Sequence, residues 1–135
     1  MIKLFFPAID NSEIISTVKT LKSGFWASGA GVGNVKKFEN KFKRYTNASE
    51  CVAVDSGTAA LDLALKVLNI NKKEVLVPSL TFVSSINAIK YNGGIPIFVD
   101  VKPDTLCMDP EDLENKISKK SKVILPVHFG GYSCD

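Results

Sequence analysis

The chain has 135 residues, which is enough for one domain with a hydrophobic core and too few for two domains of ordinary size. Hydrophobic residues make up 45% of the chain and charged residues 23%, so the composition excludes a disordered polypeptide. The formal net charge of +3 is too small to indicate a nucleic-acid partner, and no apolar run is long enough to span a membrane.

The three cysteines, Cys51, Cys107 and Cys134, are an odd number and have no metal-ligand spacing. We therefore expect unpaired thiols in a reducing cytoplasm and no metal site. The apolar stretch at the start of the chain is broken by Pro7 and is too short for a signal peptide.

The first fifty residues predict two helices with a glycine-rich stretch between them. Asn11 or Ser12 can cap a helix that reaches Leu21, and the glycine-rich stretch covers residues 23–33. A second helix is indicated by apolar residues at helical spacing, namely Val35, Phe38, Phe42 and Tyr45. Lysines and an arginine cover most of the rest of this second helix, as is typical of a solvated face.

After residue 50 the pattern alternates between strands and helices. Strands are predicted at 51–54, 74–77, 95–101 and 122–127. Helices are predicted from Asp55-Ser56-Gly57-Thr58 through Leu68, over 81–91, and from an N-cap at Asp109. Strands and helices in this order require mostly parallel pairing with right-handed crossovers, so the fold class is α/β with helices on both faces of the sheet.

In an open α/β sheet, ligands bind at the carboxyl ends of the strands. Ser56-Gly57-Thr58 lies between a predicted strand and a helix, where free backbone N–H groups and the helix dipole favour a phosphate. The alternative is that Ser56 or Thr58 only caps the helix. Phe82, beyond the next strand, can lie flat on a planar ligand or belong to the core.

Two other features carry less weight. His128 is the only histidine, and a lone histidine after a strand is more often a hydrogen-bonded structural residue than a catalyst. Gly29 to Gly33 contains a GxGxG pattern, but no strand precedes it, so it does not match a dinucleotide-binding fingerprint.

The ordered motifs of the chain together resemble the N-terminal part of the DegT/DnrJ/EryC1/StrS sugar aminotransferases, which depend on pyridoxal 5'-phosphate (PLP) and have the aspartate-aminotransferase fold. The resemblance covers nearly the whole chain. It rests on Gly24-Phe25-Trp26 with Ser28-Gly29, Val35 and Phe38-Glu39, Val54 to Leu61, Glu74 to Pro78, Thr81 to Ser84, Gly94 to Val101, and Pro126 to Gly131.

The resemblance implies roles for three groups of residues. The turn before the first helix of the α/β part would hold the cofactor phosphate, an aromatic residue would stack on the pyridine ring, and the glycine-rich loop would reach the substrate. The corresponding residues are Ser56, Gly57, Thr58 and Ala59 for the phosphate, Phe82 for the ring, and Trp26, Ser28 and Gly29 for the substrate.

The resemblance also implies an organisation and partners. Residues 1–50 would form N-terminal helices with the substrate loop, and residues 51–135 the first part of the cofactor-binding domain. The implied enzyme is a cytoplasmic homodimer that takes a nucleotide-linked keto-sugar and an amino donor, glutamate or glutamine, for amino-sugar and cell-surface polysaccharide synthesis.

The residues that react with the cofactor in the family have no counterpart in this chain. In the family, an Asp that pairs with the pyridine nitrogen, a Ser near the phosphate and the Schiff-base Lys lie further downstream, and no lysine here matches that Lys. We therefore expect an N-terminal portion that is inactive and poorly soluble on its own. Two alternatives stay open: a dehydratase of the same family that uses pyridoxamine phosphate, and a non-catalytic fragment that binds a phosphate compound or a sibling subunit.

Overall fold

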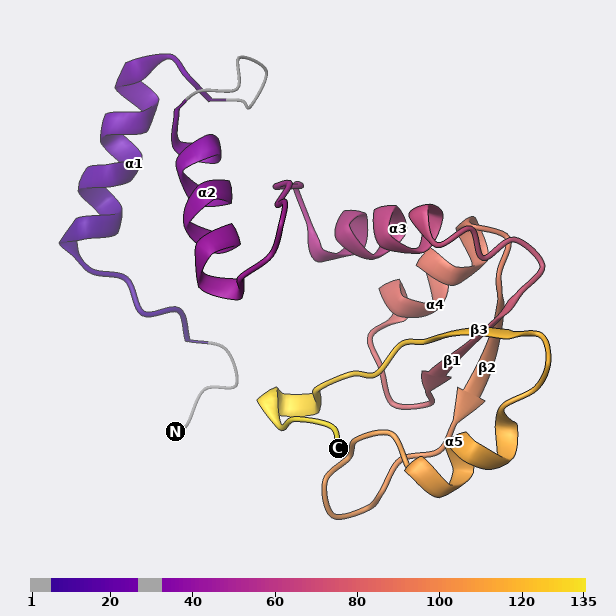
Figure 1. Cartoon of the computed structure of the whole chain (residues 1–135). Coiled ribbons are helices and arrows are strands. Elements are labelled where there is room, and N and C mark those ends of the chain that lie inside the picture. Colours follow the sequence, from indigo (N-terminus) through magenta and orange to yellow (C-terminus); the bar gives the residue numbers. More distant parts are fainter. Residues whose placement is uncertain (1–5, 27–32) are drawn as a thin grey trace. The chain divides into compact units, whose positions relative to one another are not determined.

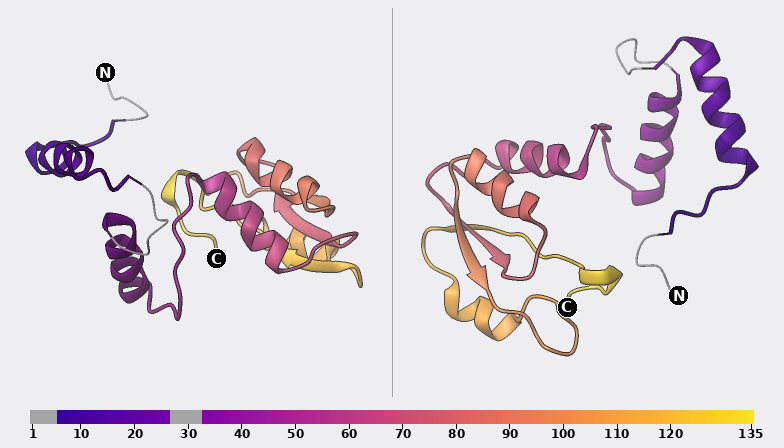
Figure 2. Two further views of the ribbon diagram at one scale, coloured as in Figure 1. Left: turned by 90° about the horizontal axis from the view of Figure 1, so that it is seen from above. Right: turned by 180° about the vertical axis from the view of Figure 1, so that it is seen from behind.

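The computed structural model describes residues 6–26 and 33–135. These residues fall into two compact units, Met1–Ala53 and Val54–Asp135. Figures 1 and 2 show the elements of each unit, which we describe separately.

The first unit contains two helices, α1 (Asn11–Ser23) and α2 (Asn34–Thr46), as the apolar spacing predicts. The predicted cap of α1, Asn11 or Ser12, was wrong by one or two residues. Asp10 is the N-cap: its Oδ1 accepts the Ser12 N–H at 2.6 Å, and the Asp10 N–H donates to Glu13 Oε2 at 2.8 Å. This reciprocal capping box satisfies two backbone donors at once.

The second unit is a three-stranded parallel sheet with helices. Its order is β2-β1-β3, so β1 is the central strand. In chain order, the elements are α3 (Gly57–Val67), β1 (Glu74–Pro78), α4 (Val83–Tyr91), β2 (Ile95–Val99), α5 (Pro110–Lys116), β3 (Ser121–Ile124) and the short 3₁₀ helix η1 (Phe129–Gly131).

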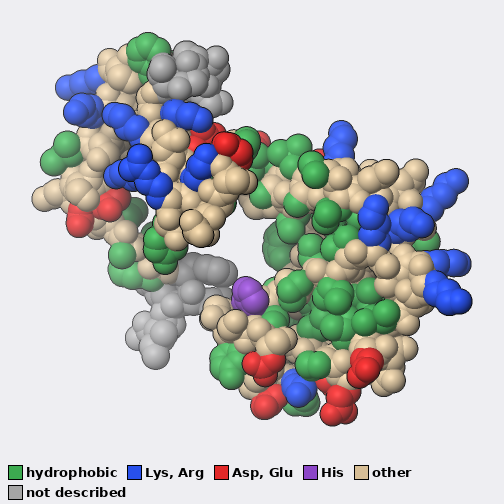
Figure 3. Space-filling view, viewed as in Figure 1, with side chains coloured by type: hydrophobic (Ala, Val, Ile, Leu, Met, Phe, Trp, Pro, Cys, Tyr) green, Lys and Arg blue, Asp and Glu red, His purple; other side chains and the backbone are tan. Residues whose placement is uncertain are grey.

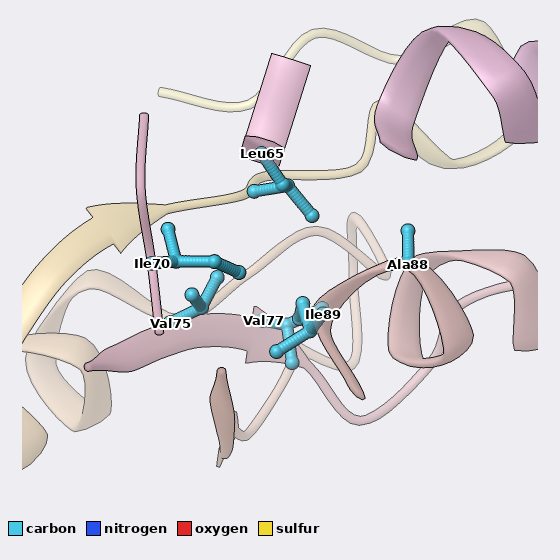
Figure 4. Close-up of a cluster of buried hydrophobic side chains, with 6 residues drawn as sticks. All are labelled: Leu65, Ile70, Val75, Val77, Ala88 and Ile89. Carbon is cyan, nitrogen blue, oxygen red and sulfur yellow. The ribbon is translucent and has the colours of Figure 1, made fainter. Parts of the chain in front are cut away.

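The central strand β1 is buried on both of its faces. Val75 and Val77 point into a cluster with residues of α3 and α4, and Leu76 points into a second cluster on the opposite face. The first cluster, drawn in Figure 4, consists of Leu65, Ile70, Val75, Val77, Ala88 and Ile89. The second consists of Leu76, Val99 and Met108. Side chains alternate between faces along a strand, so a continuous apolar run can serve both layers.

The predicted strand at 51–54 was wrong. Val52 and Val54 are exposed, and the Ala53 N–H donates to the Glu39 carboxylate at 3.0 Å instead of joining a ladder. No strand is assigned to this run in the part of the chain that the structure describes. A strand needs a neighbour to pair with, and an apolar run of four residues does not supply one.

Two strands are shorter than predicted, and one helix begins later. β2 ends at Val99, and β3 ends at Ile124. One further ladder bond, from the Leu125 N–H to the Leu76 carbonyl at 2.8 Å, extends the β3 pairing before Pro126, which has no N–H to donate. α4 begins at Val83 rather than at Thr81.

Hydrophobic side chains remain exposed on the outer strands. Ile95, Phe98 and Ile124 are each close to half exposed. Figure 3 shows hydrophobic side chains gathered on the visible surface of the α/β unit. Within residues 6–26 and 33–135, no helix has both the length and the apolar character that a bilayer crossing requires.

Candidate functional site

The turn before α3 is organised by the Ser56 hydroxyl. Ser56 Oγ accepts the Ala59 N–H at 3.2 Å and donates to the neighbouring Asp55 carboxylate at 3.1 Å. Ser56 is therefore the N-cap of α3, as one of the two interpretations of the sequence predicted.

Capping by Ser56 leaves two backbone donors at the start of α3. Among the described residues, no acceptor takes the N–H of Gly57 or of Thr58, because these are the first two positions of the helix. A Cβ added at Gly57 would meet no atom within 4 Å, so the space beside this backbone is open. Two exposed N–H groups at a positive helix end form an environment that favours an anion.

Phe82 is the N-cap residue of α4 and is not a core residue. Its side chain is 75% exposed, although the backbone around it is fixed: the Phe82 carbonyl accepts the Ser85 N–H at 3.0 Å. Thr81 Oγ1 donates to Ser85 Oγ at 2.9 Å and holds the same turn. The ring is thus not part of the core that the described residues form.

The N-termini of α3 and α4 lie toward the same side of the α/β unit. Figures 1 and 2 show the two helices side by side and similarly directed. Asn92, the residue after α4, fastens them: its side-chain amide donates to the Asp62 carboxylate at 2.7 Å and to the Ala88 carbonyl at 2.9 Å. The sequence does not indicate this contact, because an Asn after a helix signals only a helix end.

The chain that leaves β2 is fixed to the start of α5. The Asp100 N–H donates to Asp112 Oδ2 at 2.7 Å, and the Lys116 ammonium donates to the same oxygen at 2.7 Å. The Asp100 hydrogen bond, followed by that of Lys116, holds the pKa of the Asp112 carboxyl below its usual range. The Asp112 carboxylate therefore ties the chain after β2 to α5.

His128 is hydrogen-bonded, as the sequence analysis predicted of a structural histidine. Its Nδ1 accepts the Cys134 N–H at 3.1 Å, so the proton of the neutral ring belongs on Nε2. His128 lies in the same α/β unit, after β3, and its side chain is exposed.

Of the residues predicted to contact a substrate, Trp26 is described and Ser28 and Gly29 lie outside the described residues. The Trp26 indole N–H donates to the Leu21 carbonyl at 3.0 Å, near the C-terminus of α1, and the ring is 72% exposed. Trp26 belongs to the first unit, whereas Ser56, Phe82 and their neighbours belong to the second.

The arrangement in the second unit has a defined chemical capacity. A helix end with free N–H groups suits a phosphate, and an exposed aromatic ring at the neighbouring helix end suits a planar group. The Thr58 hydroxyl, which has no partner among the described residues, adds a third donor.

Comparisons with known proteins identify the family that the chain resembles. The model of the DegT/DnrJ/EryC1/StrS aminotransferase family matches residues 7–135. The spore coat polysaccharide biosynthesis protein SpsC of Bacillus subtilis (strain 168) is 42% identical over 130 residues, which are 96% of this chain and 33% of SpsC. GDP-perosamine synthase of Escherichia coli O157:H7 is 46% identical over 111 residues, 82% of this chain and 30% of that enzyme.

A solved structure has the same fold. NtdA from Bacillus subtilis, solved with the bound cofactor PMP, matches with a TM-score of 0.82 and 34% sequence identity, over 94% of this chain and 30% of NtdA. The chain thus spans about a third of the length of the proteins it matches. From its match over residues 7–135, the chain belongs to the DegT/DnrJ/EryC1/StrS aminotransferase family.

Proposed function

We propose that this protein is a PLP-dependent aminotransferase that acts on a nucleotide-linked keto-sugar in amino-sugar and surface-polysaccharide synthesis. The observation that carries the proposal is the start of α3, where the N–H groups of Gly57 and Thr58 are free next to open space. The names of SpsC and of GDP-perosamine synthase support the substrate class.

The residues present fit a phosphorylated pyridine cofactor. Gly57, Thr58 and Ala59 would hold the phosphate at the helix end, with Ser56 fixing the turn, and the exposed Phe82 ring would lie on the pyridine. When bound, the cofactor supplies an electron sink for the carbon that exchanges its amino group. NtdA, solved with PMP, supports this cofactor class.

The Ser56 hydroxyl has a positioning role in this proposal. It already accepts from Ala59 and donates to Asp55, so it keeps the turn in shape and does not itself need to reach the phosphate. The direct donors would be the N–H groups of Gly57 and Thr58 and the Thr58 hydroxyl. A charged acceptor makes such hydrogen bonds stronger than neutral ones.

We extend the proposal to organisation and partners. Residues 1–50 would carry the substrate loop with Trp26, Ser28 and Gly29, and residues 51–135 would form the first part of the cofactor-binding domain. The enzyme would work in the cytoplasm as a homodimer with glutamate or glutamine as the amino donor. The family resemblance supports these points, and the three free thiols suit a reducing compartment.

The direct test is an amino-transfer assay on the protein expressed from its own reading frame. It uses PLP, a GDP- or UDP-linked 4-keto-sugar, and glutamate or glutamine, with product masses measured by mass spectrometry. Amino-sugar formation with matching consumption of the donor supports the proposal. A deoxygenated sugar without net consumption of the donor would identify a dehydratase, and no turnover of any of these sugars would contradict the proposed activity.

A further inference from the structure

In the α/β unit, the Cys107 thiol contacts the segment that carries Cys134, although the two cysteines are far apart in the sequence. Cys107 is buried in the turn between β2 and α5, with 4% of its surface exposed, and Cys134 is partly buried after η1. The Cys107 thiol donates to the Tyr132 carbonyl at 3.5 Å, and the Cys134 thiol donates to the Val127 carbonyl at 3.2 Å.

The hydrogen bond from the Cys107 thiol to the Tyr132 carbonyl sets Cys107 beside the stretch of chain that includes Cys134. Burial raises the pKa of the Cys134 thiol, the Cys107 side chain raises it further, and a hydrogen bond with the Met108 backbone lowers it in part. The turn and the last residues of the chain line one pocket. Its lining includes Cys107, Met108, Tyr132 and Ser133. Figure 1 shows these last residues beside the turn before α5.

We propose that Cys107 and Cys134 form an intramolecular disulfide when the protein meets a disulfide oxidant such as oxidised glutathione. The bond would link the segment after β3 covalently to the turn before α5. Cys51 belongs to the first unit and is not part of this pair. The proposal is independent of the aminotransferase activity.

The reaction is an ordinary thiol–disulfide exchange. The more accessible Cys134 thiolate attacks oxidised glutathione, forms a mixed disulfide and releases one glutathione thiolate. The Cys107 thiolate then attacks the Cys134 sulfur and releases the second glutathione. The two protein thiols lose two protons and two electrons in total, and one oxidised glutathione becomes two reduced glutathiones.

The proposed bond joins the chain that leaves β2 to the chain that leaves β3, the two outer strands of the sheet. Both segments start at the carboxyl ends of these parallel strands, so oxidation would stiffen the edge of the sheet at which α/β proteins bind ligands. Because the Cys134 thiol has a raised pKa, little of it is thiolate at neutral pH, and the bond would form slowly under sustained oxidation.

The test is a disulfide map of the full chain. The protein is equilibrated in buffers of reduced and oxidised glutathione, alkylated with iodoacetamide, digested and analysed by mass spectrometry. We expect the peptide that links Cys107 to Cys134 to exceed any peptide containing linked Cys51 by at least about tenfold, since a thiol held in place has an effective concentration in the millimolar range. Hydrogen exchange should also slow across residues 128–135 after oxidation.

Variants and a gel separate the outcomes. C134S should abolish the linked peptide, whereas the matched variant C51S should leave its yield unchanged; Cys134 is the better site to replace because Cys107 is more buried. The proposal is overturned if oxidation gives only glutathionylated Cys134, only pairs with Cys51, or only cross-links between two chains on a non-reducing gel. Unchanged hydrogen exchange in the disulfide-linked protein would overturn the claim that the bond restrains the segment after β3.

Discussion

The Ser56 hydroxyl oxygen accepts the Ala59 N–H at 3.2 Å, and this one hydrogen bond determines which backbone groups at the start of α3 remain free. Because the cap takes the third N–H of the helix, the first two, those of Gly57 and Thr58, point outward without a partner among the described residues. Capping and anion binding are thus compatible functions of the same turn.

Removing the cap should destabilise α3. Ser56→Ala removes the acceptor for the Ala59 N–H, and the loss of an N-cap serine typically costs about 1 kcal/mol. We expect a decrease of this size in the free energy of unfolding, measured with urea. Ser56→Asn, another good N-cap residue, should retain most of the stability. Thr58→Ala, an exposed change on the same turn, is the matched control, and an equal loss in that variant would refute the capping argument.

The Asp112 contacts predict a specific pH dependence. A carboxyl with a lowered pKa in the folded state stabilises the fold at pH values above its unfolded pKa, and this contribution is lost as the pH falls through the folded pKa. Asp112→Asn should therefore destabilise the protein at pH 7 and have much less effect near pH 2. Glu114→Gln, an exposed change on α5, should have little effect at either pH. A pH-independent effect of Asp112→Asn in urea unfolding would contradict the assignment.

Gly94 has no room for a side chain. A Cβ there would lie 2.7 Å from Ile70 Cδ1, 3.0 Å from Ile89 Cγ2 and 3.1 Å from the Ile89 carbonyl oxygen. Gly94→Ala should lower the free energy of unfolding by about 1–3 kcal/mol, the usual effect of overpacking a core. Gly57→Ala, where the added Cβ meets open space, should not destabilise the protein in the same thermal or urea unfolding experiment. Equal stability of the two variants would show that the packing around Gly94 is looser than described.

Phe82 should matter for cofactor retention and little for folding. Its ring is 75% exposed, so Phe82→Ala removes little buried surface from the chain itself. Ring stacking contributes on the order of 1 kcal/mol beyond area burial, so we expect PLP to bind about fivefold more weakly. Val83→Ala, a change at the adjacent exposed residue, is the control. Unchanged PLP affinity in Phe82→Ala, measured by equilibrium dialysis, would remove the ring from the proposed site.

Local patterns predicted most elements because the same residues serve local and tertiary structure. The apolar spacing in α2, the Asp109-Pro110 start of α5 and the continuous apolar run in β1 each indicate their elements directly. The pairing of strands cannot be predicted from a local pattern, because it depends on partners elsewhere in the chain. The run at 51–54 has the composition of a strand, yet Ala53 donates to Glu39 on α2 rather than to a neighbouring strand.

The candidate site was predictable in part for the same reason. Ser56, Gly57 and Thr58 are adjacent in sequence, so their arrangement at a helix start follows from the local pattern. The exposure of Phe82 and the contact between the Cys107 thiol and the Tyr132 carbonyl depend on how distant segments pack, and neither has a sequence signal of its own.

The central claim is that the start of α3 holds the cofactor phosphate. Its most direct test compares the PLP affinities of two variants, Gly57→Pro and Gly57→Ala, in the protein expressed from its own reading frame. Proline is tolerated at the first position of a helix and removes the N–H, whereas alanine keeps it; the preceding Ser56 is already extended, as a residue before proline prefers. A hydrogen bond to a charged group contributes about 1.5–3 kcal/mol, so Gly57→Pro should bind PLP at least about tenfold more weakly than Gly57→Ala. Binding of pyridoxal, which lacks the phosphate, should not distinguish the two variants. Equal PLP affinity of Gly57→Pro and Gly57→Ala would contradict the claim that the start of α3 holds the cofactor phosphate.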